Sequence, residues 1–406
     1  MIITKLNRNS PLFSIAGRLI SLSLTFFITI LIARELGVES FGEFGYIKVL
    51  ITIIFVLTSF GNDIYIISLM SNKCQDKINL FHLFLIRLSL FALLCLVLSL
   101  FIYSDFTVAL SLAFFFQLSN FGILYNYARK ENFDIFIFSF ISAIFTLLIY
   151  YNFSFCLESV YLLSVYYLSL NLLFFKKTIK SFGNNFSLRL ISSTTTTVFR
   201  DVWPILLTSV AIFIYLRVDV LLISSMLSME DVGIYSIASQ LTEPLSIVVS
   251  TYAASIVSDI KSLDEKNKSD KLINVLKFVN LYSLTVFVTM LVLGDYIIAN
   301  LYGENFSAAY YPLLILAFSK LFTFANLFLS SIMIVDGKYL TRLYRTLITL
   351  VLNSSFGFVL GLKFGISGVA LSVLLTQALS VLFLNYVYKD TRIYFKCFTR
   401  SLLLWK

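Results

Sequence analysis

Residues 11–33 read PLFSIAGRLISLSLTFFITILIA, a long apolar run in which Arg18 is the one charged side chain. An α-helix rises about 1.5 Å per residue, so about 20 apolar residues cross the hydrocarbon core of a membrane. The run is longer than the core of a signal peptide, and no small-residue cleavage site stands out after it. We therefore expect a first transmembrane helix that stays uncleaved.

The whole chain has the composition of a membrane protein. Of its 406 residues, 59% are hydrophobic and 13% are charged. A soluble domain carries about 25% charged residues, so this chain has too few charges to cover a soluble surface. The runs long enough to cross a membrane lie near residues 11–33, 43–61, 79–103, 106–127, 134–152, 155–175, 201–225, 233–258, 273–299, 308–335, 342–363 and 366–388. They predict an all-α polytopic membrane protein with 12 transmembrane helices, the eighth of them kinked at Pro244.

The positive charges alternate between the gaps that separate these helices. The odd-numbered gaps carry few, chiefly Arg34 and Lys363, whereas the even-numbered gaps and the tail carry most of the lysines and arginines. Cytoplasmic loops of membrane proteins are enriched in Lys and Arg. The alternation therefore predicts that both termini are cytoplasmic, and it accounts for the net charge of +9 without a nucleic-acid partner.

A polar interval between Lys176 and Asp201 divides the chain into two halves. Its Ser/Thr run and basic residues are typical of a cytoplasmic linker. We predict an N-terminal six-helix lobe, a linker, a C-terminal six-helix lobe and a basic cytoplasmic tail. These parts cover residues 1–176, 177–200, 201–388 and 389–406, respectively.

The two halves share a short internal repeat. LGVESFGEFGY follows the first predicted helix, and LSMEDVGIYSI follows the seventh. Three residues match in the same spacing: Leu36, Glu39 and Gly42 correspond to Leu227, Glu230 and Gly233. A parallel repeat predicts two lobes related by an axis along the membrane normal, with the substrate between them. Chance similarity is the alternative, because the match is short.

Polar side chains form narrow stripes on several predicted helices. In the first helix, Ser14, Arg18, Ser21, Thr25 and Thr29 are spaced three or four residues apart and share one face. The simplest interpretation of the hydroxyl groups is close helix packing with hydrogen bonds across the interface.

Four cations on such stripes need a further explanation, because an unpaired charge inside a bilayer is costly. They are Arg18, Lys48, Arg217 and Lys320. Arg18 and Lys48 lie within a turn or two of their helix ends, so snorkelling to the membrane surface and facing a wet cavity are equal alternatives. Arg217 and Lys320 lie deeper, which favours a cavity. Together these cations predict a water-filled lumen that binds an anionic ligand such as phosphate.

Arg217 and Asp219 stand two residues apart in IYLRVDVLLI, residues 214–223. On a helix this spacing is a rotation of about 200°, so the two side chains point to different sides. We expect Arg217 to face the substrate and Asp219 to face a partner in the C-terminal lobe.

Residues 215–245, YLRVDVLLISSMLSMEDVGIYSIASQLTEPL, resemble polysaccharide biosynthesis proteins of the O-antigen flippase type. These belong to the multidrug/oligosaccharidyl-lipid/polysaccharide exporter superfamily. RELGVESFGEFGY, LYGENFSAAYYPLLIL and KFGISGVALSVLLTQ are similar to further segments of the family. Asp63 departs from the pattern, since relatives often carry a basic residue a little further on.

The resemblance implies two six-helix lobes around a central cavity. It also implies transfer of a polyprenyl-pyrophosphate-linked oligosaccharide, such as an O-antigen repeat unit, to the outer leaflet of the bacterial inner membrane. The expected partners are that substrate, membrane lipid, a polysaccharide polymerase and a chain-length regulator, with the chain itself a monomer. No P-loop motif is present, so direct use of ATP is not expected.

The candidate site residues follow from this hypothesis. The substrate-binding candidates are the intramembrane cations and amides: Arg18, Lys48, Arg217, Lys320, Gln117, Asn120 and Asn326. Asp219 and Glu243 are candidates for coupling to a proton or sodium gradient, and a structural ion pair with a basic neighbour is the equal alternative. The four scattered cysteines and the single histidine form no metal motif, so neither a metal nor a cofactor is expected.

Two other classes of protein are weighed against the flippase. A drug antiporter of the same superfamily should favour acidic groups in its N-terminal lobe, whereas the charges there are basic: Arg18, Lys48 and Arg87. A polysaccharide polymerase or glycosyltransferase should carry catalytic groups in a large external loop, but every predicted external gap is short. We therefore expect a transporter rather than an enzyme.

Overall fold

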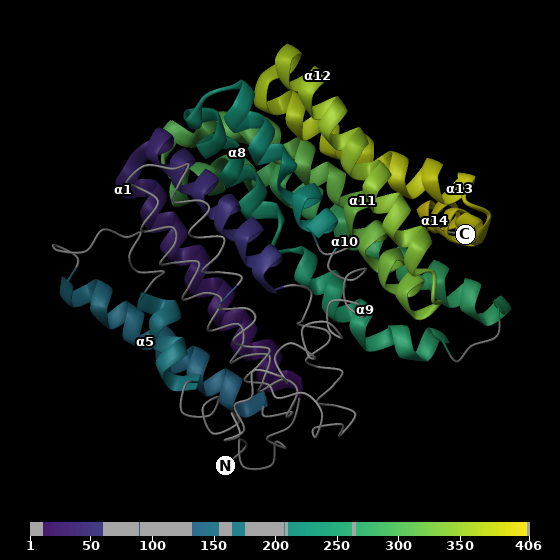
Figure 1. Cartoon of the computed structure of the whole chain (residues 1–406), viewed down its shortest axis with the longest axis horizontal. Helices are drawn as coiled ribbons and strands as arrows, with labels where there is room; N and C mark the ends of the chain where they lie inside the picture. The colour runs from purple at the N-terminus through teal and green to yellow at the C-terminus, as the bar shows by residue number, and fades with distance from the viewer. Residues whose placement is uncertain are drawn as a thin grey trace. The chain divides into compact units, whose positions relative to one another are not determined.

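The computed structural model describes residues 11–59, 89, 132–153, 165–174, 207, 210–261 and 265–403 (Figure 1). All of the secondary structure in these residues is helical, which confirms the predicted all-α class. The main helices are α1 (Pro11–Ser59), α5 (Asn132–Phe153), α8 (Met229–Thr242), α9 (Ser246–Lys261), α10 (Glu265–Leu301), α11 (Tyr310–Val335), α12 (Tyr339–Leu379) and α14 (Arg392–Leu402). Shorter elements are η2 (Glu304–Ala309), η3 (Ser380–Leu384), α13 (Asn385–Val387) and η4 (Lys389–Thr391). Residues 165–174 and 210–226 are also helical.

Two of the long elements turn at a glycine. Gly37 in α1 has φ of 77° and Gly365 in α12 has φ of 58°, and both residues leave the helical conformation. Positive φ is strained for residues with a Cβ atom, so glycine permits a sharp turn within a single residue. Each of these elements therefore contains two of the predicted helices, and the glycine turn lies in the predicted gap between them.

Pro244 divides the eighth predicted helix in two. α8 ends at Thr242, and α9 begins at Ser246. Proline has no backbone N–H and clashes with the preceding turn, so the helix cannot continue through it. The predicted kink is confirmed.

The chain divides into two compact units. One contains residues 1–35 and 47–213, and the other contains residues 36–46 and 214–406. The segment Leu36–Tyr46 of α1 thus belongs with the C-terminal part of the chain, where Gly42 packs against Gly233 of α8. The lobe boundaries predicted near residues 176 and 201 lie outside the described residues.

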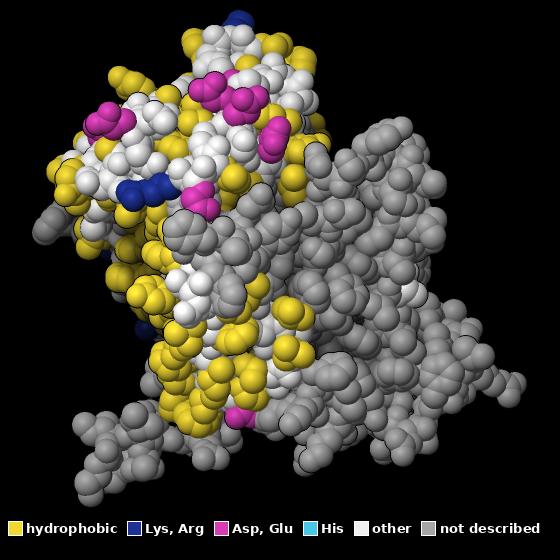
Figure 2. Space-filling model, turned by 90° about the vertical axis from the view of Figure 1, so that its left-hand side faces the viewer, with side chains coloured by type: hydrophobic (Ala, Val, Ile, Leu, Met, Phe, Trp, Pro, Cys, Tyr) yellow, Lys and Arg dark blue, Asp and Glu magenta, His cyan; other side chains and the backbone are white. Residues whose placement is uncertain are grey.

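Six helices in the described part of the chain are long and apolar enough to cross a membrane. Hydrophobic side chains are exposed over much of this part, and Asp and Glu side chains gather in one area of the face that Figure 2 shows. Exposed apolar side chains of this size are favourable against lipid and costly against water. The chain is a multi-pass membrane protein. The predicted total of twelve helices and the positions of the termini depend on residues outside the described ranges.

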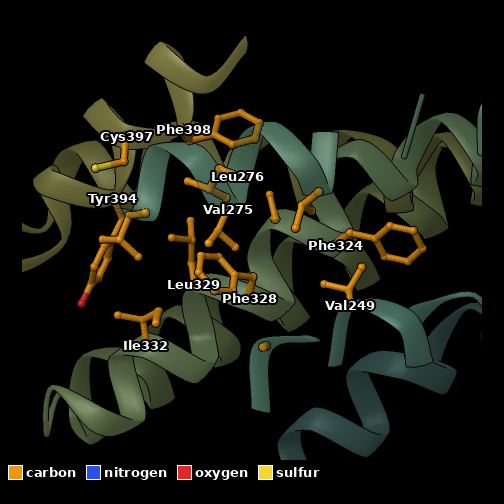
Figure 3. Packing of buried hydrophobic residues seen from close by; sticks show 14 of the residues in the cluster. Val249, Val275, Leu276, Phe324, Phe328, Leu329, Ile332, Tyr394, Cys397 and Phe398 are labelled. Carbon is orange, nitrogen blue, oxygen red and sulfur yellow. The ribbon is translucent and has the colours of Figure 1, made fainter. Parts of the chain in front are cut away.

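The core of the second unit lies between α9, α10, α11 and α14. Its buried members include Val249 of α9, Leu276 of α10, Phe328 of α11 and Phe398 of α14 (Figure 3). These side chains are at most 1% exposed. α14 therefore packs onto the helical bundle, although its sequence belongs to the predicted basic tail.

Candidate substrate and ion site

A polar pocket of about 70 Å³ lies within the second unit. Its walls come from the helix at residues 210–226 and from α8, α11 and α12. The polar side chains that line it are Tyr215, Asp219, Tyr235, Ser239, Thr242, Glu243, Lys320, Thr323, Asn353 and Gln377. Three of the predicted site residues, Asp219, Glu243 and Lys320, thus meet at one place. Charged groups inside a membrane helix bundle usually mark substrate or ion pathways.

Arg217 forms a two-pronged ion pair beside this pocket. Its Nη1 donates to Oε1 of Glu243 at 2.9 Å, and its Nη2 donates to Oε2 at 3.1 Å. Glu243 occupies the position directly after α8, just before Pro244. The planar guanidinium matches a carboxylate in this geometry. The structure therefore favours the ion-pair interpretation of Glu243, and the charge of Arg217 is balanced.

Asp219 bonds a different partner. The hydroxyl of Tyr235 in α8 donates to Oδ2 of Asp219 at 2.6 Å, and the backbone N–H of Val220 donates to Oδ1 at 2.9 Å. The carboxylate is 9% exposed and faces the pocket. Arg217 and Asp219 thus bond different residues, but both partners belong to α8 or directly follow it. Asp219 lines the pocket and Arg217 lies beside it, which differs from the prediction that Arg217 faces the substrate and Asp219 faces away from it.

Lys320 of α11 is the buried cation of the pocket. The residue is 9% exposed, and within the described ranges its ammonium forms no salt bridge with a carboxylate. Ser283 of α10 donates to the backbone carbonyl of Lys320 at 3.3 Å, which fixes the helix beside it. Lys320 shares the pocket with the carboxylates of Asp219 and Glu243 but forms no salt bridge with either, so its ammonium is available to an anionic ligand.

Asn326 is held in a chain of hydrogen bonds one turn away from the pocket. Its Nδ2 donates to Oε1 of Gln377 at 3.2 Å, and Gln377 in turn donates to the hydroxyl of Tyr215. Nη2 of Arg345 donates to Oδ1 of Asn326 at 3.2 Å. Both polar atoms of the Asn326 side chain are therefore engaged, so its predicted contact with sugar requires a rearrangement.

Arg345 is a buried cation that the sequence pattern did not single out. The residue is 3% exposed and also donates to the backbone oxygen of Ser380 at 3.0 Å, at the start of the π-helical turn η3. Its Nε has no partner in the described part of the chain. Arg345 lies near the start of a predicted helix, where a cation is expected to snorkel. Arg345, Thr349 and Asn353 follow one another at intervals of four residues and so share one face of the helix. This polar stripe was the signal in the sequence that could have indicated a buried Arg345.

Comparison with known proteins supports this architecture. The structure titled lipid II flippase MurJ, inward closed conformation, has a TM-score of 0.70 at 20% identity, covering 97% of this chain and 91% of that chain. An inward-facing multidrug resistance MATE family transporter of the MOP superfamily has a TM-score of 0.67 at 14% identity, covering 96% and 98%. At these identities the likeness is one of fold.

A family model described as polysaccharide biosynthesis protein matches residues 31–311. The chain belongs to this family. Two curated relatives are similar over shorter stretches. The probable low-salt glycan biosynthesis flippase Agl15 of Haloferax volcanii is 28% identical over 200 residues, 46% of this chain and 41% of that protein. The capsular polysaccharide biosynthesis protein CapF of Staphylococcus aureus is 27% identical over 134 residues, 33% of each chain. The similarity thus spans less than half the length of these relatives.

The candidates in the first unit of this polysaccharide biosynthesis protein are more exposed. Arg18 and Lys48 are exposed on α1. The hydroxyls of Ser21, Thr25 and Thr29 donate to backbone oxygens four residues earlier, at 3.1, 2.9 and 2.8 Å. Ser21 also accepts a hydrogen bond of 2.6 Å from the hydroxyl of Tyr166 in another helix, which agrees with a packing role for the stripe. Gln117, Asn120 and Asp63 lie outside the described residues.

Proposed function

We propose that this chain is a flippase for a lipid-linked oligosaccharide, with a prenyl pyrophosphate as the lipid anchor. The observation that carries the proposal is the buried ammonium of Lys320, which faces a polar pocket among apolar helices in a member of the polysaccharide biosynthesis family. Without a protein, a sugar and a pyrophosphate cross hydrocarbon slowly because they lose their hydration. A polar pathway replaces that hydration while the prenyl chain stays in lipid.

The pocket suits a small group better than a whole oligosaccharide. Its volume of about 70 Å³ holds a few water molecules or one hydrated ion. We assign Lys320 to the phosphate of the substrate, since Arg217 already has a carboxylate partner. The remaining candidates, Arg18, Lys48, Gln117, Asn120 and Asn326, would contact the substrate as the two lobes alternate their access.

Asp219 is the proposed coupling residue. Its carboxylate is buried, faces the pocket and binds one neutral donor side chain, Tyr235, rather than a cation. A proton or a sodium ion arriving at Asp219 would neutralise it. Reconstituted vesicles with an imposed sodium or proton gradient test this role. The Asp219→Asn variant should flip substrate without acceleration by either gradient, whereas Tyr235→Phe should keep a gradient response. A full gradient response in Asp219→Asn would remove the residue from coupling.

Deletion of the gene tests the function itself. Lipid-linked repeat units should accumulate on the cytoplasmic side of the membrane, out of reach of a membrane-impermeant oxidant added to intact cells. Surface polysaccharide should fall, and the intact gene should restore it. Unchanged polysaccharide with altered drug tolerance would instead support the antiporter.

We place the protein in the bacterial inner membrane as a monomeric transporter rather than an enzyme, working beside a polysaccharide polymerase and a chain-length regulator.

A further inference from the structure

α14 presents two chemically different faces. Tyr394, Cys397, Phe398 and Ser401 are buried on one side. Arg392, Lys396 and Arg400 follow one another at intervals of four residues and are exposed. Residues four apart lie on the same face of a helix, so the three cations form a single row. We call this row the basic face of α14.

The buried side holds α14 firmly against the bundle. Ser401 accepts a hydrogen bond of 2.9 Å from Nδ2 of Asn280 in α10. Tyr394, Cys397 and Phe398 belong to the same buried cluster as Leu276 of α10 (Figure 3). Near the beginning of α14, the hydroxyl of Tyr394 donates to Oδ2 of Asp336 at 2.5 Å. Because the helix is anchored at both ends, the direction of the basic face is set by the fold.

The three cations of the basic face form no salt bridge with any carboxylate in the described part of the chain. The Nε of Arg392 donates to the backbone oxygen of Tyr386 at 3.0 Å, and its guanidinium lies 5.6 Å from the ring centre of Tyr386. These contacts orient the charge of Arg392 without neutralising it.

The position of α14 is that of a helix at the membrane surface. The apolar span of α12 extends to Val387, five residues before α14 begins. The neighbouring start of α10 reads EKNKSDKLINVLK, residues 265–277, and a sequence this rich in charge is suited to the headgroup layer. Exposed Leu402 and Leu403 at the end of α14 add apolar groups beside the cations. Cationic faces with apolar flanks are typical of helices that lie in a membrane interface.

We propose that the basic face of α14 binds the phosphate headgroups of anionic phospholipids. The three cations are opposite in sign to the phosphates of phosphatidylglycerol and cardiolipin, and the fixed helix holds them in one row. Each cation near an anionic membrane surface strengthens binding about fivefold. Bound lipid would stabilise the position of α14. Since Asn280 and Phe398 join α14 to α10, it would also stabilise α10 in the core of the second unit.

The experiment is native mass spectrometry of the full-length protein with phosphatidylglycerol or phosphatidylcholine added in equal amounts. The wild type should bind phosphatidylglycerol preferentially. Lys396→Gln should weaken that binding about fivefold, and the triple variant Arg392→Gln/Lys396→Gln/Arg400→Gln should abolish the preference. Lys363→Gln, which removes another exposed lysine, is the matched control and should bind as the wild type does.

A variant that keeps the charges but changes the side chains distinguishes electrostatic binding of headgroups from recognition of the arginine side chains themselves. The Arg392→Lys/Arg400→Lys variant should retain the preference for phosphatidylglycerol, and high salt should reduce it. Equal lipid preference in the triple variant and the wild type would overturn the proposal. So would a triple variant that keeps its lipid but loses a protein that otherwise purifies with it, since the face would then be a protein interface.

Discussion

Gly42 and Gly233 pack against each other's backbone without space for a side chain. A Cβ atom on Gly42 would lie 1.7 Å from the carbonyl oxygen of Met229, and one on Gly233 would lie 2.2 Å from the carbonyl oxygen of Val38. Each glycine therefore faces the residue four positions before the other. These are equivalent positions of the internal repeat, so its two copies meet in a pseudo-symmetric contact. Packing thus gives both copies the same requirement for glycine.

Replacing either glycine should destabilise the second unit. Gly42→Ala and Gly233→Ala both force backbone apart, and overpacking of this kind costs about 1–3 kcal/mol. We expect a lower midpoint of thermal unfolding in detergent. Gly361→Ala is the control, because its Cβ would meet only side-chain atoms, at 3.1 Å or more. Equal midpoints for all three variants would contradict the close contact.

The ion pair between Arg217 and Glu243 should tolerate reversal better than removal. Arg217→Ala leaves a carboxylate without its partner, and Glu243→Ala leaves a guanidinium, so each should lower flipping about tenfold. The swapped variant Arg217→Glu/Glu243→Arg should recover part of that loss. Complementation of the deletion strain at matched protein levels measures the effect. If the swap is worse than both single variants, Arg217 acts on the substrate rather than through Glu243.

Lys320 should require a positive charge. Lys320→Ala and Lys320→Met should abolish complementation at normal protein levels, because the proposed phosphate contact is lost. Lys320→Arg should retain part of the activity. Thr323→Ala, one turn further along the same helix and also in the pocket, should have a smaller effect. Full complementation by Lys320→Met would exclude the residue from the substrate pathway.

Arg345 should contribute through geometry as well as charge. Arg345→Lys keeps the charge but has one terminal nitrogen, whereas in arginine Nη2 donates to Asn326 and Ser380 while Nη1 donates to Sδ of Met333. We expect loss of activity in Arg345→Lys, with protein still present in the membrane. Ser380→Ala removes only a side-chain acceptor at 3.4 Å and should be mild. Wild-type flipping by Arg345→Lys would show that the charge alone suffices.

Asp336 should make stability depend on acid pH. Burial raises its pKa, but hydrogen bonds from Lys268 and Tyr394 and the nearby charge of Lys338 lower it more, so the pKa lies below the ordinary value. The charged form is favoured in the folded state, and its stabilisation is complete above the unfolded carboxyl pKa of about 4. That stabilisation is lost as the pH falls below about 4 and then below the lower pKa that Asp336 has in the folded protein, where the carboxylate becomes protonated. Thermal unfolding between pH 3 and 7 should show this loss, and Asp336→Asn should reduce it. Asp295→Asn, at an exposed carboxylate, is the control.

Local sequence determined much of this protein. Apolar runs predicted the membrane class and the helices, because each helix satisfies its own backbone hydrogen bonds and needs only length and hydrophobicity. Pro244 marked a real break, whereas the two-residue spacing of Arg217 and Asp219 did not show that both side chains bond to α8 and its end. The sequence also singled out the buried charges Asp219 and Lys320, since few charges occur within its apolar runs.

Tertiary structure alone decided the partners. Glu243 lies 26 residues after Arg217, and periodicity cannot show that these two side chains meet. Nor can it show that Lys320 forms no salt bridge with a carboxylate among the described residues. Arg345 was missed because its depth depends on the helices packed around it rather than on its distance from a helix end. The contact of Gly42 with Gly233 joins segments far apart in the chain. A helix pattern tells which residues share a face, whereas the packing between helices determines what that face touches.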